Sequence, residues 1–347
     1  MKILKKLLLV SLFAGINLVY AQNPQATGLA LSGQKDMKIS YEFENYDAWK
    51  IQQKNLPRAW QSFDKNILSK ERLWAKDNLN NNNLAKISLL FYPFSGPDIT
   101  HPLQFFPDAT QYLLFGLEPV GTLLDVENTS EVEFSNVVSQ INSSTSEVIG
   151  RNFFRTIDMA KQIKTNNSGV ASILTFFLTL NNNKIDNVNI INAKEYGVPG
   201  VEIQFTTAEG VKKSLTYWNA DISNSGLAKH SKFFQLLESK LQQPNATMIK
   251  AASYLMWSNN FSKIKNLVLD KSEYILMDSS AFKINNFSDQ WKVQHFGNYI
   301  KPINLFKGYL DNDLKQYFIE NKSEKLPFYY GYSNGNISSN LIWATKK

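Results

Sequence analysis

Residues 87–121, ISLLFYPFSGPDITHPLQFFPDATQYLLFGLEPVG, decide which fold we expect from this chain. Residues 87–92 are an apolar run that stops at a Pro-Phe-Ser-Gly-Pro-Asp turn, and residues 112–117 are a second run that ends in Leu-Glu-Pro. Runs bounded in this way predict two buried strands joined by a short helical crossover. Because ligands in open α/β sheets usually lie at the carboxyl ends of the strands, we expect a polar cleft where these two strands end.

The rest of the chain predicts a fold between α/β and α+β, with a Rossmann-like strand–helix–strand start joined to a mixed, partly antiparallel sheet with flanking helices. We expect residues 22–347 to form a single mature domain. Its α/β part covers residues 22–180 and its mixed α+β part covers residues 181–347, and both parts share one sheet.

Periodicity along the sequence gives the expected elements. Helices are expected at residues 47–76 (split near Pro57), 130–164, 169–180, 231–241, 246–257 continuing into 261–267, and 311–321 with Asp311 as its cap. Further strands are expected at residues 188–191, 200–206, 213–218, 274–277, 291–296 and 340–344, with a hairpin turn at Glu209-Gly210.

The first long helical segment, residues 47–76, carries an apolar stripe at spacings near three, four and seven residues. The stripe consists of Trp49, Leu56, Trp60, Phe63, Ile67 and Trp74. Such a stripe is typical of a helix that packs on a sheet, so we expect these side chains in the core and not in a sugar-binding platform.

The first 21 residues have the layout of a secretory signal peptide. Lys2, Lys5 and Lys6 precede an apolar core at residues 7–16, which is too short to span a membrane, so we do not expect the alternative of an N-terminal membrane anchor. Val19 and Ala21, an aliphatic and a small residue at positions −3 and −1, predict cleavage near Ala21/Gln22. We therefore expect export to the periplasm or the medium, and no transmembrane segment in the mature chain.

Composition excludes several classes of protein. The chain has no cysteine, so disulfides, cysteine-ligated metals and cysteine nucleophiles are absent, and 43% hydrophobic and 13% aromatic residues supply a core by burial alone. Three of the seven net positive charges belong to the signal sequence, and the remaining lysines and arginines are scattered among acids. That pattern does not favour nucleic-acid binding. No cofactor is identified by the sequence.

Several motifs resemble those of a family of uncharacterised exported bacterial proteins. The motifs are YPFSGPD at residues 92–98, FFP at 105–107, GLEPVG at 116–121, AASYLM at 251–256 with Phe261-Ser262, and LPF at 326–328 with Gly331-Tyr332. The resemblance spans most of the mature chain and implies membership without an activity. Many relatives carry two acids, Ser and Gly where this chain has Asp278-Ser279-Ser280, so the chain departs from the pattern there.

The turn after the first strand contains Ser95, Gly96 and Asp98, which we predict as site residues. Gly96 permits close approach of the backbone to a ligand, while Asp98 either faces that ligand or caps the following helix. Glu118 ends the second run, where burial is expected and a carboxylate must be paired, hydrogen-bonded or protonated. Asp98 and Glu118 are therefore a candidate general acid and base, or else structural carboxylates.

Two enzyme classes are disfavoured by spacing. Ser95, Asp98 and His101 crowd into one turn without a nucleophile elbow, so we do not expect a serine hydrolase. His230 and His295 have no ligand partner at i+3 or i+4, so we assign no metal ligand.

The turn is also similar to the Gly-rich loop of dinucleotide or S-adenosylmethionine enzymes, with Glu118 about twenty residues further on as the ribose-binding acid. The second and third glycines are missing, and these cofactors are scarce outside the cytoplasm. A working nucleotide enzyme is therefore not favoured, although a repurposed Rossmann-like half fits.

Asp221 and Asp278 follow other predicted strands. If they converge with Asp98 and Glu118, the four carboxylates form an oxygen-rich pocket for Ca²⁺, Mg²⁺ or a sugar, on which Trp218 could stack. As separate residues, each acid is a turn or capping residue.

We thus predict either a non-catalytic protein that binds a small polar ligand or serves an envelope role, or a glycosidase-like hydrolase that uses Asp98 and Glu118. Carboxyl groups about 5–9 Å apart across an open cleft would favour the hydrolase, and acids buried in hydrogen bonds would favour the binding protein.

Overall fold

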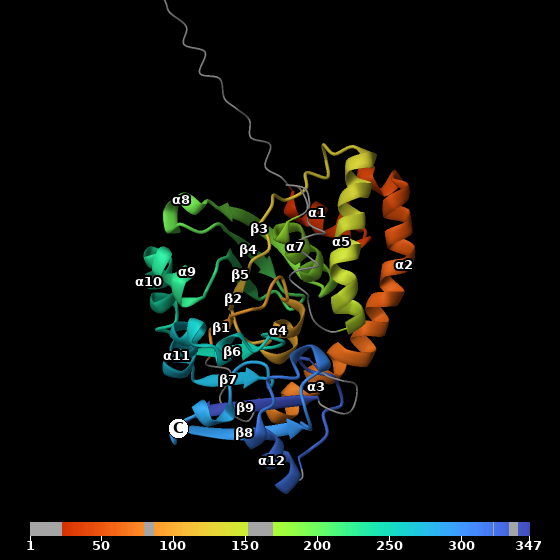
Figure 1. Cartoon of the computed structure of the whole chain (residues 1–347). Coiled ribbons are helices and arrows are strands. Elements are labelled where there is room, and N and C mark those ends of the chain that lie inside the picture. Colours follow the sequence, from red (N-terminus) through yellow and green to blue (C-terminus); the bar gives the residue numbers. More distant parts are fainter. Residues whose placement is uncertain (1–22, 80–86, 152–168, 322, 333–338) are drawn as a thin grey trace, which may run out of the picture.

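The computed structural model describes residues 23–79, 87–151, 169–321, 323–332 and 339–347. Within this part of the chain, nine strands form one mixed sheet in the order β3-β4-β5-β2-β1-β6-β7-β9-β8 (Figure 1). The strands are β1 (Leu89–Tyr92), β2 (Gln111–Gly116), β3 (Lys184–Ile191), β4 (Gly200–Thr206), β5 (Lys212–Asn219), β6 (Asn245–Ile249), β7 (Tyr274–Met277), β8 (Trp291–Gly297) and β9 (Asn340–Lys346). The expected mixed α/β fold is confirmed, while the predicted signal peptide lies outside the described residues.

The centre of the sheet is parallel and its two flanks contain antiparallel pairs. Strands β5, β2, β1, β6 and β7 run parallel, whereas β3 and β4 on one side and β9 on the other run against their neighbours. Counted along the chain, the five parallel strands have the spatial order third-second-first-fourth-fifth, which is that of the first five strands of a Rossmann sheet. The order changes direction between β1 and β6, and we call the carboxyl ends of these two strands the switch point.

Helices cover both faces of the sheet (Figure 1). They are α1 (Pro24–Ser32), α2 (Asp47–Phe63), α3 (Ser69–Asn78), α4 (Thr100–Phe105), α5 (Glu131–Arg151), α7 (Val170–Leu180), α8 (Ala193–Tyr196), α9 (Asn224–Lys229), α10 (Ser231–Lys240), α11 (Ser262–Lys271) and α12 (Asn312–Glu320). Helices α1–α5 and α7 pack on the face that holds Leu90 and Tyr92 of β1, and α9–α12 pack on the face that holds Leu89 and Phe91. Because both faces are covered, all four residues of β1 are buried.

Several predicted elements are confirmed at nearly their expected bounds. The 87–121 stretch forms β1, the short crossover helix α4 and β2, as expected. All eleven residues of α7 are buried, which agrees with the predicted buried helix. Asp311 caps α12 by accepting a hydrogen bond from the backbone N–H of Leu314 at 3.1 Å.

Two predicted elements are wrong. Helix α2 continues through Pro57, because buried residues on both sides of the proline pack on one face. The break comes instead at a π turn over Asp64–Leu68, before α3.

The segment at 246–257, predicted as a helix, begins instead with strand β6 and continues in 3₁₀ turns. A strand buried between β1 and β7 shows no alternation, and its apolar run therefore looked helical. Part of the helix predicted over 130–164 forms α5, and residues 152–168 lie outside the described residues.

Candidate functional site

All four predicted acids follow a parallel strand and therefore lie toward the carboxyl-terminal edge of the sheet. Asp98 follows β1, Glu118 follows β2, Asp221 follows β5 and Asp278 follows β7. The structure does not join them into one carboxylate cluster, since each has its own hydrogen-bond partners.

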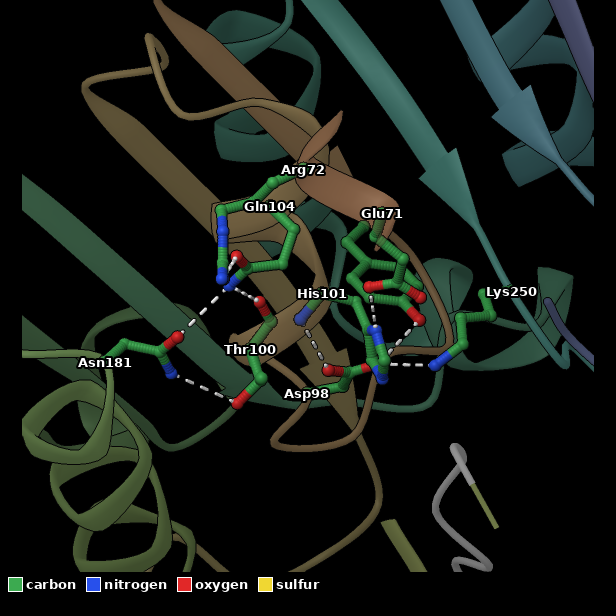
Figure 2. Close-up of polar contacts among 9 residues, drawn as sticks. Glu71, Arg72, Asp98, Thr100, His101, Gln104, Asn181 and Lys250 are labelled. Atoms are coloured by element: carbon green, nitrogen blue, oxygen red, sulfur yellow. Dashed lines mark hydrogen bonds and ion pairs between the residues drawn. The ribbon is translucent and has the colours of Figure 1, made fainter. Parts of the chain in front are cut away.

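Asp98 forms a buried ion pair at the switch point with Lys250, which directly follows β6. Its Oδ2 lies 3.3 Å from the Lys250 Nζ, and the two side chains are 3% and 1% exposed (Figure 2). The Tyr92 hydroxyl donates to the same oxygen at 3.2 Å, and the backbone N–H of His101 donates to Oδ1 at 3.3 Å. Burial would raise the pKa of Asp98, but His101 and Lys250 outweigh it and lower that pKa. We call this contact the switch-point ion pair.

A second buried contact joins α3 to α4. The His101 Nδ1 lies 2.8 Å from the Glu71 Oε2, and both side chains are fully buried (Figure 2). The Glu71 Oε1 and His101 Nε2 atoms have no hydrogen-bond partner among the described residues. The sequence held a signal for this contact that we missed, because Glu71 stands four residues after Ile67 and three before Trp74, on the apolar stripe.

Asp278 forms hydrogen bonds that connect three loops, which contain Ser280, Tyr332 and Ala251. Its carboxylate accepts hydrogen bonds from the Ser280 hydroxyl at 2.6 Å, from the backbone N–H of Tyr332 at 3.2 Å and from the backbone of Ala251. Gly331 packs so closely that an added Cβ would lie 1.8 Å from the Asp278 Oδ2. Burial raises the pKa of Asp278, and these hydrogen bonds offset only part of that rise.

The loops at the switch point are strained. Phe94 after β1 and Ala251, Ser253 and Tyr254 after β6 all have φ between +53° and +63°, a region that costs about 1–2 kcal/mol per non-glycine residue. The switch-point ion pair and the Asp278 contacts hold these loops in place. Within the loop after β6, the Tyr254 ring stacks on Tyr309 with centroids 4.8 Å apart. The carboxylates of Asp98 and Asp278 thus have a structural role in these loops.

Ser95 and Gly96 attach the first turn to β2. The Ser95 hydroxyl donates to the carbonyl of Phe115 at 3.1 Å and accepts from its N–H at 2.9 Å, and the Gly96 N–H donates to the same carbonyl at 2.9 Å. Gly96, with φ of +54°, approaches Gly116 and the Glu118 side chain closely. The close backbone approach predicted for Gly96 is therefore an approach to the protein's own residues at the end of β2.

Glu118 is fully buried beneath that turn. The hydroxyl of Tyr217 lies 3.1 Å from its Oε2 and 2.9 Å from its carbonyl, and Asn219 donates its side-chain N–H to the same carbonyl at 2.7 Å. Burial, and then the charge of Glu118, raise the pKa of Tyr217. The Glu118 Oε1 has no hydrogen-bond partner among the described residues.

The two remaining predicted site residues lie apart. Trp218 is buried between Phe233 and Tyr196, with ring centroids 5.3 Å and 5.6 Å away, so its ring belongs to the core and not to a ligand surface. Asp221 is exposed and its Oδ1 accepts from the backbone N–H of Ser223 at 2.9 Å, which is the turn role that we had weighed against a ligand role.

A cavity of about 740 Å³ lies at the opposite end of the sheet, near where β2 and β5 begin. We call it the strand-start cavity. It is lined by Ser32, Gln34, Pro57, Trp60, Gln61, Asp64, Arg72, Leu103, Gln104, Pro107, Leu180, Asn181, Asn182, Asn183, Thr207, Ala208, Glu209 and Lys213. Its size is within the range of small-molecule sites, and side chains from well-separated segments converge on it. Sequence reasoning did not find it, because only the tertiary fold brings these segments together.

Hydrogen bonds order the polar wall of this cavity (Figure 2). Arg72 donates to the Gln104 Oε1 at 2.6 Å and to the Asp64 Oδ1 at 2.7 Å. The Gln104 amide in turn donates to the Asn181 Oδ1 at 3.1 Å and to the carbonyl of Thr100 at 2.9 Å. Arg72 directly follows Glu71, and Gln104 shares α4 with His101, so the same two helices build the buried contact and the cavity wall.

A second cavity of about 610 Å³ lies beside the end of β2 and is mostly apolar. Leu117 and Pro119, the neighbours of Glu118, line it together with Ile190 of the edge strand β3. Leu117 is 62% exposed, but the adjoining carboxylate faces inward. This cavity therefore lacks the charged groups that chemistry on a substrate would need.

Comparisons with known proteins give no further indication: no protein-family model, curated protein or solved structure matches this chain. The described residues include no group of three or more His, Asp or Glu side chains arranged to hold a metal ion. Of the helices in the described ranges, none has the length and apolar character needed to cross a membrane.

Proposed function

We propose that this chain is an exported, non-catalytic binding protein that takes a small polar ligand in the strand-start cavity. One observation carries the proposal: in a cavity of about 740 Å³, 12 of the 18 lining residues have an amide, hydroxyl or charged side chain, and they come from separate segments of the fold. Such convergence of polar groups on a concave site is characteristic of ligand recognition.

The state of the two candidate catalytic acids supports binding over hydrolysis. A glycosidase-type pair must face a substrate across an open cleft. Asp98 is 3% exposed in an ion pair and Glu118 is fully buried, so neither carboxylate faces solvent in this structure. The hydrogen bonds of both carboxylates are formed with groups of the surrounding protein. The hydrolase alternative therefore stays a prediction without a supporting contact.

Export to the periplasm or the medium is supported by the sequence of residues 1–21 alone. A protein outside the cytoplasm meets sugars, cell-wall fragments, peptides and ions more often than nucleotides. The proposal thus places a ligand of that kind in the strand-start cavity, with a role in binding or envelope maintenance.

A thermal-shift screen tests the proposal. The panel holds sugars, cell-wall fragments, amino acids, nucleotides and divalent metal salts, and a ligand that binds only the folded state raises Tm. We expect a shift that is lost in Gln61→Ala, inside the cavity, and kept in the control Asn55→Ala, an exposed position on the same helix α2. A shift that survives Gln61→Ala but disappears in Glu118→Gln would instead put the ligand at the strand ends and refute the proposal.

A further inference from the structure

The two cations of the strand-start cavity already have partners within the protein. Two cations, Arg72 and Lys213, and two acids, Asp64 and Glu209, line it, so their charges sum to zero. Arg72 is in an ion pair with Asp64 at 2.7 Å. An anionic ligand would therefore have to compete with Asp64 for Arg72.

Lys213 is held even more firmly. Its Nζ donates to the backbone carbonyls of Pro107 and Ala109, the latter at 2.9 Å, and the residue is only 8% exposed. Burial lowers the pKa of Lys213, which is the direction expected for an ammonium with little access to water. The Lys213 ammonium therefore stabilises the loop before β2 and is not free to bind an anion.

Two amides of the cavity wall are open, in contrast to the two cations. The side chains of Gln61 and Asn182 have no hydrogen-bond partner among the described residues. Asn182 follows α7 with φ of +60°, a left-handed conformation that asparagine tolerates better than most residues. Each amide offers two N–H donors and a carbonyl acceptor, which match hydroxyl groups because hydroxyls also donate and accept.

An aromatic ring completes the wall. Trp60 belongs to the apolar stripe that we expected to be core, and Trp49, Leu56 and Phe63 of that stripe are indeed buried. Trp60 is half-buried: it packs against that core, as expected, and it also lines the cavity. Its ring packs against Phe63 at 5.7 Å, so it is held in place before any ligand arrives.

We infer that the ligand of the strand-start cavity is a neutral saccharide, and this inference rests on the proposed function. A sugar ring presents an apolar C–H face to the Trp60 ring and a rim of hydroxyls to the open amides of Gln61 and Asn182. Its lack of charge matches a cavity in which every cation is already paired or hydrogen-bonded. A phosphorylated or acidic sugar would bring an anionic group for which neither cation of the wall is free.

Isothermal titration calorimetry with matched neutral and charged sugars tests the inference. The probes are glucose, N-acetylglucosamine and cellobiose, each compared with a charged relative: glucose 6-phosphate, glucosamine and cellobionate. The proteins are the wild type, Gln61→Ala, Asn182→Gly and Trp60→Ala, with Trp60→Phe retaining a ring and Asn55→Ala as the control. Asn182→Gly keeps the left-handed backbone while it removes the amide.

We expect at least one neutral sugar to bind the wild type and Asn55→Ala equally. Loss of one amide should weaken Kd by about 2- to 10-fold, the equivalent of one hydrogen bond, and Trp60→Ala should weaken it more than Trp60→Phe. Binding of only the charged relatives, with the same dependence on Gln61, would overturn the neutral-sugar inference and leave the proposed function intact. If none of the six probes binds in a way that depends on the cavity residues, the inference is overturned, and failure of the wider thermal-shift panel would separately remove the proposed function.

Discussion

Removal of either partner of the switch-point ion pair should cost the protein much of its stability. Asp98 and Lys250 are 3% and 1% exposed and their charged atoms lie 3.3 Å apart. In Lys250→Met, the carboxylate of Asp98 keeps its hydrogen bonds from Tyr92 and His101 but loses its cation inside the protein. An uncompensated buried charge of this kind costs about 3–5 kcal/mol, which is a large share of the roughly 5–15 kcal/mol that stabilises a typical domain.

Removal of both charges should cost much less than the sum of the single losses. In the double variant Asp98→Asn/Lys250→Met, no buried charge is left without its partner. We expect a coupling energy of about 2 kcal/mol or more between the two positions. The pKa of Asp98 is lowered in the folded protein, so the contribution of the pair is fully present above the unfolded pKa near 4 and is lost as pH falls through the lower folded value. The coupling should therefore stay constant from pH 7 down to about pH 4.

Urea unfolding followed by tryptophan fluorescence measures these free energies at pH 7. The exposed Asp289→Asn serves as the control and should change stability by less than about 0.5 kcal/mol. The reasoning is refuted if Asp98→Asn costs under about 1 kcal/mol and adds independently to Lys250→Met. Such behaviour would describe an accessible carboxylate, which is what the hydrolase alternative requires.

Three further predictions follow from other contacts. Burial lowers the pKa of His295 to about 4, so the unfolded chain takes up a proton first as pH falls from 6.5, and stability should drop by at most about 3 kcal/mol between pH 6.5 and 4. The variant His295→Phe keeps a ring beside Tyr317 and should make the unfolding free energy from urea titrations depend less on pH in this range, whereas an unchanged pH dependence would contradict the prediction. Gly331→Ala should cost about 2 kcal/mol or more in the same assay, because φ is +63° and the new Cβ meets Asp278, and a cost below about 0.5 kcal/mol would disprove the close packing. Gln61→Ala should leave the unfolding free energy within about 0.5 kcal/mol, and a loss above about 2 kcal/mol would show that this side chain is structural.

The sequence predicted the parallel centre of the sheet where local pattern and tertiary burial agree. The apolar runs of β1 and β2 stop at turn residues, and both strands were located correctly. Strand β6 was assigned to a helix because a strand buried on both faces has no alternation, and its Ala and Met residues also suit helices. Pro57 suggested a break that does not occur, because the packing of α2 outweighs one missing hydrogen bond.

The site was harder to predict than the fold, because position at a strand end does not fix the direction of a side chain. The pattern placed Asp98 and Glu118 correctly after their strands, yet it contained nothing about Lys250, whose location depends on the misassigned β6. The strand-start cavity depends on segments as far apart as Gln34 and Lys213. No local pattern carries that information, although one stripe residue, Trp60, was noticed and assigned to the core.

The energetics of the switch point argue against a ligand site there and favour the strand-start cavity, where we propose one. In a Rossmann-like order, the crevice between the first and fourth parallel strands is the usual ligand site. Here that position holds the switch-point ion pair, and Asp278 holds the strained loop that follows β6. A ligand entering there would have to separate a buried pair, at a cost of several kcal/mol, and release loops that these contacts keep in unfavourable conformations. In the strand-start cavity, a neutral ligand would instead meet open amides and a half-buried ring, and it would break no contact of comparable strength.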